Sequence, residues 1–286
     1  MSASTYKADL HMHSTCSDGK FSPTELVHRA KNFGFSCIAI TDHDTMEGVE
    51  EATAEGLSLG VEVIPAVEVT ASYNDRECHV LCYGIDQRNP TWKTMLQAQQ
   101  RLRQSRADRI LEKLGEMGVY LEMEDVQSVD ADVVTRPHIA KALVKSGHAT
   151  HSKDAFDRFI GNTAPAYVPL DHISVADLVK TAHGAGGVAV LAHPGSLYTS
   201  QQLLELIGHG IDGFEYLHPS HSYALQTKYR SLAEEHGLIV TAGSDFHGFR
   251  FQDFSYFGYI FADYGIVSQI KNRCMAIKSA FLAIES

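Results

Sequence analysis

The run CIAIT at residues 37–41 is short and apolar and is followed directly by polar residues, as expected of a strand buried in a sheet. A helical pattern over Gly48–Leu59 comes next, and further pairs of an apolar run and a helical segment recur along the chain. Strands that alternate with helices favour parallel βα units, either closed into a barrel or wound into an open sheet. The other predicted strands are Ala8–Met12, Val61–Val67, His79–Tyr83, Val188–Ala192, Gly213–Leu217, Leu238–Thr241 and, from its alternating aromatic residues, Phe254–Phe261.

Residues 90–167 interrupt this alternation. They contain a long polar helical pattern over Thr91–Met117 and further helical patterns after Thr135, with no strong strand between them. We therefore predict an α/β barrel domain formed by residues 1–89 and 168–286, and a helical insertion that lies over one end of it.

The composition restricts the classes of protein to which the chain can belong. Of its 286 residues, 44% are hydrophobic and 21% are charged, which is typical of a globular rather than a disordered protein. The formal net charge of −11 argues against a protein that coats long nucleic acid, because such binding needs Lys and Arg to neutralise phosphates. A small phosphorylated substrate is compatible with this charge, since a bound metal ion can supply positive charge locally.

The sequence also gives an expectation about location. No apolar run approaches the ~18 residues that a membrane span requires, and the first residues lack the apolar core of a signal peptide. The five cysteines are sparse and odd in number, which indicates reduced thiols. We therefore expect a cytoplasmic protein without a membrane partner.

Histidine is abundant, with 16 residues. His11 and His13 are two residues apart in a predicted strand, so both side chains point to one face. His79 begins its predicted strand, which indicates that this strand runs in the opposite direction. Further acidic residues and histidines end the other strands or follow in the next turn: Asp18, Asp42, His43, Asp44, Glu68, His193, Asp245 and His247.

These polar residues are expected to meet in space. The carboxyl ends of parallel barrel strands converge at one mouth, where the active sites of such folds lie. A cluster of carboxylates and imidazoles there is unfavourable unless cations offset its charge. Because these ligand types suit zinc, manganese or iron, the sequence predicts a site for several divalent metal ions.

Six segments together resemble the PHP (polymerase and histidinol phosphatase) family. The resemblance spans nearly the whole chain, and the segments occur in the family's order. It implies a distorted (β/α)7 barrel with a helical insertion over the active-site mouth and three divalent metal ions, with Mn2+ preferred over Zn2+ or Fe2+. The segments are LHMHSTCSDG (10–19), AITDHDT (39–45), AVEVT (66–70), CHVLCYGI (78–85), LAHPG (191–195) and GSDFH (243–247).

The resemblance also implies which residues hold each ion. Glu68 would bridge the first and second ions. The implied ligands are His11, His13, Glu68 and Asp245 for the first ion, Glu68, His79 and His193 for the second, and Asp18, His43 and His247 for the third.

Substrate-binding residues are expected on the insertion and at one strand end. The family places an Arg-x-His there that contacts substrate, which corresponds to Arg136 and His138, and Asp44 is a further candidate. The guanidinium of Arg136 suits bidentate binding of a phosphate, although an arginine in the first turn of a helix can also be ordinary. Relatives often have arginine where this chain has Ser196.

Two further groups of residues leave alternatives open. A stripe of basic side chains on the long helix of the insertion fits either a solvated helix face or a track for the phosphates of a short RNA. His218 and His221 follow a predicted strand and could donate a proton to a leaving oxygen or be plain surface histidines. The stripe consists of Arg101, Arg103, Arg106, Arg109 and Lys113.

The resemblance to stand-alone bacterial PHP proteins implies hydrolysis of a nucleotide phosphate ester by a metal-activated hydroxide. The expected substrates are nucleoside 3′,5′-bisphosphates, losing the 3′-phosphate, and short 5′-phosphorylated RNA, degraded 5′→3′. The alternatives are a histidinol-phosphatase-like enzyme, an amidohydrolase-type C–N hydrolase and a PHP module without catalysis. No predicted strand end offers the lysine typical of amidohydrolases, and all nine ligand positions are filled, which disfavours the last two.

Overall fold

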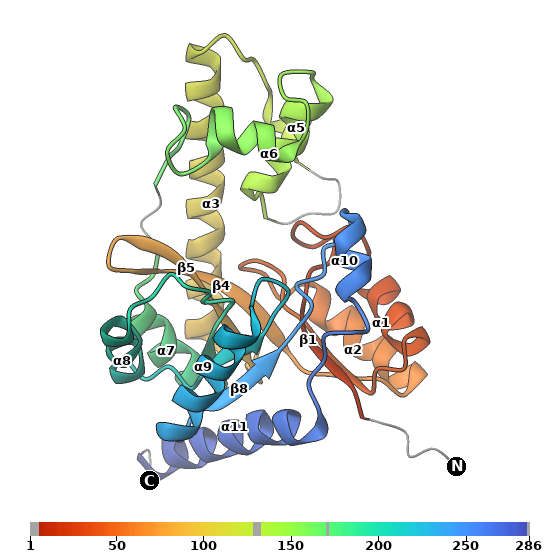
Figure 1. Ribbon diagram of the computed structural model, residues 1–286, viewed down its shortest axis with the longest axis vertical. Coiled ribbons are helices and arrows are strands. Elements are labelled where there is room, and N and C mark those ends of the chain that lie inside the picture. The colour runs from red at the N-terminus through yellow and green to blue at the C-terminus, as the bar shows by residue number, and fades with distance from the viewer. Residues whose placement is uncertain (1–5, 128–132, 170–171, 285–286) are drawn as a thin grey trace.

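The computed structural model describes residues 6–127, 133–169 and 172–284 (Figure 1). Its strands form two sheets. The first has three parallel strands in the order β1 (Ala8–Met12), β2 (Cys37–Ile40) and β3 (Glu62–Val63). The second has five strands in chain order: β4 (Ala66–Tyr73), β5 (Arg76–Tyr83), β6 (Val188–Leu191), β7 (Gly213–Leu217) and β8 (Ile239–Ala242).

The two sheets adjoin without forming one closed sheet among the described residues. An isolated parallel bridge pairs Met12 with Phe246 after β8, and another pairs His43 with Glu68. The α/β class is therefore confirmed, and the ends of β1 and β2 lie against the ends of β8 and β4.

The hairpin of β4 and β5 differs from the expectation. The predicted strand Val61–Val67 is wrong as a single element, since Pro65, which has no amide hydrogen, separates β3 from β4. Glu68 consequently lies inside β4 rather than at a strand end, and His79 lies inside β5 rather than at its start. The expected reversal of direction is confirmed, because β5 is antiparallel to both β4 and β6.

Helices cover the outer faces of both sheets (Figure 1). Helix α1 begins with the capping box of Ser22 and Glu25, with Pro23 in its first turn, and buries Leu26 and Val27. No helix in the described part of the chain combines the length and the apolar character needed to cross a bilayer. The helices outside residues 90–167 are α1 (Pro23–Asn32), α2 (Gly48–Leu59), α7 (Val175–Gly184), α8 (Ser200–Gly208), α9 (Tyr223–Glu235), α10 (Phe251–Tyr256) and α11 (Tyr264–Ile284).

The predicted strand Phe254–Phe261 is wrong, because its first residues belong to helix α10. The Asp253 carboxylate accepts hydrogen bonds from the backbone amides of Phe249 and Arg250, which stabilises the helical turn. Phe257 then turns inward and packs against Phe246, with ring centroids 4.6 Å apart. The Phe257 ring is therefore buried because the chain turns after α10, and not because it lies on the inner face of a strand.

The insertion, residues 90–167, has its own apolar cluster. Ile110 and Leu114 pack with Ile139, Leu143 and Phe159 in a cluster separate from those of the sheets. In Figure 1, α3 rises from the sheets and carries α5 and α6 near its far end. The helices of the insertion are α3 (Pro90–Glu116), α4 (Met123–Val126), α5 (Arg136–Lys145) and α6 (Ser152–Ala155), followed by a π-helical turn at Phe156–Ile160.

Candidate metal centre

The four residues expected to hold the first metal ion converge in the structure. His11 is in β1 and His13 follows it, and both are fully buried. His11 Nε2 lies 3.5 Å from Glu68 Oε2 and 3.3 Å from Asp245 Oδ1. His13 Nε2 lies 3.3 and 3.2 Å from the same two oxygens. Two imidazoles and two carboxylates therefore face one point.

Glu68 connects this group to the second one. Its other oxygen, Oε1, lies 3.0 Å from His79 Nδ1 and 3.0 Å from His193 Nε2. Oε2, which faces His11 and His13, also lies 3.1 Å from His43 Nδ1. Because its two oxygens face different histidines, Glu68 has the geometry expected of the predicted bridging residue.

The third group gathers around Asp18. Its two oxygens lie 3.3 Å from His247 Nε2 and 3.8 Å from His43 Nε2. His13 stacks on His247 with ring centroids 4.1 Å apart, and one ligand atom from each of these four residues lies within 4.8 Å of the others. All nine predicted ligands are thus brought together.

Several buried nitrogens of this cluster have no hydrogen-bond partner in the described part of the chain. Among the described residues, His11 Nε2, both ring nitrogens of His13, His43 Nδ1 and His79 Nδ1 are buried without a hydrogen bond. Leaving one such group unsatisfied costs about 1–3 kcal/mol. Divalent cations accept imidazole nitrogen and carboxylate oxygen as ligands, so the residues present fit metal ions.

The electrostatics of the cluster favour ionised carboxylates. Burial alone would raise the pKa of Glu68, but the charges of His79, His43 and His11 hold it well below its usual value. Burial lowers the pKa of His79, yet the Glu68 carboxylate overcomes this and raises it to about 10. The carboxylates therefore demand positive charge nearby, which bound cations can supply.

Two buried acids outside the predicted ligand set orient the predicted ligands, and only Glu215 of the two was missed by the sequence motifs. Glu215 in β7 accepts hydrogen bonds from His11 Nδ1 at 2.9 Å and from the backbone amide of His193 at 2.8 Å. Because Nδ1 of His11 donates to Glu215, Nε2 is left free to bind a metal ion. Asp42 accepts hydrogen bonds from Ser14 and Ser17 and so fixes the turn before Asp18. The available signal for Glu215 was a lone acid in the apolar strand GFEYL.

The backbone at the centre adopts unusual conformations. Asp44, His193 and Asp245 have positive φ angles of 51°, 26° and 50°, a backbone conformation that residues other than glycine rarely adopt. A Cβ at Gly243 would lie 2.3 Å from the Cβ of His11, so β8 can approach β1 only with glycine there. Such conformations persist where the surroundings enforce them, and here they aim two ligands inward.

His218 and His221 are both buried, so neither is a surface histidine. His218 Nε2 lies 3.4 Å from Asp245 Oδ2, at the edge of the first group. His221 donates from Nδ1 to Tyr216 O and accepts from the Gly195 amide through Nε2. His221 therefore supports the loop after His193, and His218 is the one that faces the centre.

Arg136 lies near the centre and is paired with protein groups. Its guanidinium donates to Asn162 Oδ1 at 2.7 Å and to Glu77 Oε1 at 3.2 Å. Glu77 in β5 also accepts from Arg106 Nη1 at 3.1 Å, and its Oε1 lies 3.8 Å from His79 Nε2. One acid thus joins two arginines of the insertion to a predicted metal ligand.

His138 and Asp44 have protein partners as well. His138 Nδ1 accepts a hydrogen bond from the Thr135 amide, and Thr135 Oγ1 donates to Asp18 Oδ2 at 3.2 Å. Asp44 is fully buried and accepts from the Thr70 amide at 2.9 Å and from Arg103 Nε at 2.5 Å. Contact of either residue with substrate stays a prediction.

The basic stripe of α3 is not a uniformly solvated face. Arg103 and Arg106 are buried, so that interpretation is wrong for them, whereas Arg101 and Arg109 are exposed. Arg103 pairs with Asp44, and Arg106 donates to Val168 O as well as to Glu77. These two arginines attach the insertion to the sheets.

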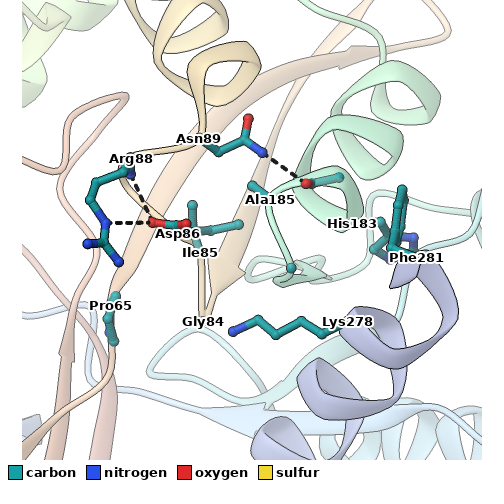
Figure 2. A pocket seen from close by; sticks show the side chains of 12 residues that line it. Pro65, Gly84, Ile85, Asp86, Arg88, Asn89, His183, Ala185, Lys278 and Phe281 are labelled. Atoms are coloured by element: carbon teal, nitrogen blue, oxygen red, sulfur yellow. Dashed lines mark hydrogen bonds and ion pairs between the residues drawn. The ribbon is translucent and has the colours of Figure 1, made fainter. Parts of the chain in front are cut away.

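A separate pocket lies at the opposite ends of the strands (Figure 2). It has a volume of about 710 Å3 and is lined by Gly84 after β5, Gly186 before β6 and Lys278 of α11. His193, in contrast, follows the other end of β6. The pocket in Figure 2 therefore does not belong to the metal centre.

Comparison with known proteins agrees with this geometry. The PHP domain model matches residues 9–101. A 5′-3′ exoribonuclease from Haemophilus influenzae is 34% identical over 85% of this chain and 90% of its own length. A 3′,5′-nucleoside bisphosphate phosphatase from Chromobacterium violaceum is 33% identical over 84% of this chain and 86% of its own.

Two solved structures share the whole architecture at 30% identity, each covering 93% of this chain and 96% of its own. One is named a metal-dependent phosphoesterase from Bifidobacterium adolescentis, with a TM-score of 0.84. The other is named an amidohydrolase from Chromobacterium violaceum with bound sulfate, with a TM-score of 0.82. Its sequence relatives and its matching domain, together with the convergence of its nine predicted ligands, show that the chain belongs to the PHP family of metal-dependent phosphoesterases.

Proposed function

We propose that this protein hydrolyses the 3′-phosphate ester of nucleoside 3′,5′-bisphosphates and the first linkage of short 5′-phosphorylated RNA. The observation that carries the proposal is the convergence of nine His, Asp and Glu side chains. Among the described residues, five ring nitrogens of this group, on His11, His13, His43 and His79, are buried without a hydrogen bond. The substrates are inferred from relatives named as a 5′-3′ exoribonuclease and a nucleoside bisphosphate phosphatase.

Three divalent ions, with manganese preferred over zinc or iron, are proposed for the three groups around Glu68 and Asp18. When bound, these ions supply Lewis-acid activation of water and of the phosphoryl group. The chain's own residues hold the ligands in place: Glu215 orients His11, and Asp42 fixes the turn that carries Asp18.

His218 is proposed to carry the proton that the leaving oxygen takes up. Its Nδ1 pairs with Ser220 Oγ at 2.8 Å, and its Nε2 lies 3.4 Å from Asp245 Oδ2 at the centre. His221 is less suited to this role, because its Nε2 already accepts the hydrogen bond of the Gly195 amide.

The second phosphate of the substrate is proposed to bind Arg136. The guanidinium is 19% exposed and is held by Glu77, whose other arginine partner is Arg106. A phosphate would replace Glu77 as the anion that faces Arg136, which favours substrates with two phosphates over monophosphates.

The two sheets are proposed to be the halves of a distorted (β/α)7 barrel. The bridges from Met12 to Phe246 and from His43 to Glu68 support this, since they join the sheets beside the metal centre. We further propose that residues 90–167 form a subdomain over the mouth of a barrel formed by residues 1–89 and 168–286. A cytoplasmic location completes the proposal, because nucleotides and RNA are found there.

A substrate panel tests the proposed function. The purified protein, with manganese added, is given a nucleoside 3′,5′-bisphosphate, the matching 3′-monophosphate, a short 5′-phosphorylated RNA, histidinol phosphate and an amide substrate. We expect kcat/KM to be highest for the bisphosphate or the RNA. Highest activity on histidinol phosphate would overturn the nucleotide assignment, and hydrolysis of the amide alone would overturn the phosphoesterase chemistry.

A further inference from the structure

A basic groove borders the metal centre on the side of Asp18. It is a pocket of about 360 Å3 between the insertion and the segments that follow β1 and β8. Figure 1 shows α5 of the insertion above α10, the helix that follows Phe249. The residues that give the groove its charge and shape are Lys20, His138, Lys141, Lys145 and Phe249.

The groove adjoins the turn that holds Asp18, a predicted metal ligand. Thr135, at the start of α5, donates to Asp18 Oδ2 at 3.2 Å and is hydrogen-bonded to His138 in the groove. Ser17 and Gly19, the residues on either side of Asp18, line the groove together with Lys141. The groove therefore lies directly beside the turn that carries Asp18.

The charge of the groove contrasts with that of the whole protein. Its lining has three lysines against one carboxylate, Asp125, although the chain carries a net charge of −11. Within the described residues, no ion pair within 4.0 Å involves any of the three lysines, whereas Lys153 of the same insertion is paired with Asp157. Lysines that lack a protein counter-ion can bind phosphates.

An aromatic ring lies beside these charges. Phe249 is about half exposed, at 49%, and Lys141 Nζ lies 3.4 Å from its ring centroid. Grooves for single-stranded nucleic acid combine basic side chains that follow the backbone with exposed rings on which bases stack. The groove has both features, and its small volume suits one or two nucleotides rather than a duplex.

The groove and Arg136 lie on different sides of α5. Arg136 and Lys145 are nine residues apart, and at about 100° per residue they are on opposite faces of the helix. Arg136 faces Glu77, and Glu77 does not line the groove. A nucleotide at the centre can therefore present its 5′-phosphate to one side and its 3′ continuation to the other.

We infer that the basic groove binds the part of a single-stranded RNA that lies 3′ to the cleaved linkage. This inference rests on the proposed function. In both proposed reactions water adds to phosphorus, the bond to the 3′-oxygen of the first nucleoside breaks, and that oxygen takes up a proton. In a bisphosphate this phosphorus carries no second nucleoside. In RNA the remaining chain stays attached to the phosphorus through its 5′-oxygen and occupies the groove.

The test measures the activity of one double variant on two substrates. Lys20 and Lys145 are exposed, so replacing both with alanine (Lys20→Ala, Lys145→Ala) preserves the fold. We expect kcat/KM for a 5′-phosphorylated tetraribonucleotide to fall about tenfold and its salt dependence to become shallower, since two phosphate contacts are lost. The value for a nucleoside 3′,5′-bisphosphate should stay within about twofold of wild type. Lys153→Ala, outside the groove, is the matched control and should change neither.

Each other outcome has a defined meaning. An equal loss on both substrates, or no loss on RNA, would overturn the groove assignment alone. Wild-type protein that cleaves the bisphosphate and not the RNA would overturn the groove assignment together with the RNA activity in the proposed function. Wild-type protein that cleaves neither substrate with manganese present would instead overturn the proposed function, and the inference with it.

Discussion

The metal centre and the contact between α3 and the sheets both bury charged side chains, and they satisfy them differently. At the contact, Arg103 is buried and paired with Asp44, and Arg106 with Glu77. At the centre, His11 and His13 are buried with ring nitrogens that have no hydrogen bond among the described residues. At the contact, each buried guanidinium has a carboxylate partner within the chain, although Nη2 of Arg106 has no hydrogen bond among the described residues. These ion pairs hold the fold, whereas the buried ring nitrogens at the metal centre require a ligand.

The largest effect is expected when a predicted metal ligand is removed. Asp245→Ala or His193→Ala should lower turnover by at least about two orders of magnitude, because each takes a ligand from a preorganised cation site. Circular dichroism should show an unchanged fold, and metal analysis should show reduced metal content. Near wild-type turnover with unchanged metal content would mean that the site is elsewhere.

The second prediction concerns the acid behind the ligands. Glu215→Gln keeps the size of the side chain and removes the charge that faces His11 Nδ1 and the His193 amide. We expect metal affinity to weaken by about ten- to a hundredfold, as is common for residues that orient metal ligands. Isothermal titration of manganese measures this. Glu205→Gln is a control outside the centre, since Glu205 pairs with Tyr73. Equal effects of the two variants would contradict the role of Glu215.

The third prediction tests the buried ion pairs between α3 and the sheets. Arg103→Lys keeps the positive charge and loses the forked donors that reach Asp44 and Thr70. We expect the free energy of unfolding to fall by about 2 kcal/mol, because buried charged hydrogen bonds are lost. Chemical denaturation gives the value. Arg101→Lys on the exposed side of α3 should leave stability unchanged, and a similar loss there would show that helix composition rather than the pair is responsible.

The same comparison explains what the sequence could predict. Several metal ligands could be predicted because they lie close together in the sequence. His11 and His13 share a strand face, and Asp245 and His247 follow another strand. Glu215 and Glu77 carry no such pattern, since their partners come from distant segments. The periodicity of α3 places Arg103 and Arg106 on one face, but only the packing of α3 against β4 and β5 decides that this face is buried. Alternating aromatics likewise do not separate a strand from the turn of α10.

The smallest effect is expected at Arg136, which shares features with both the metal centre and the ion pairs of α3. Its guanidinium is paired with Glu77 and yet partly exposed beside the centre, so it can exchange a protein anion for a phosphate. Binding energy of this kind appears in kcat/KM and separates good substrates from truncated ones. We expect Arg136→Ala to lower kcat/KM for a nucleoside 3′,5′-bisphosphate about tenfold, the loss of one charged hydrogen-bonded contact, and to affect a monophosphate less. Arg158→Ala is the control, since Arg158 is an exposed arginine of the insertion paired with Asp154. If Arg136→Ala affects mono- and bisphosphates equally, Arg136 belongs with Arg103 and Arg106 among the residues that hold the insertion, and the second phosphate has no partner there.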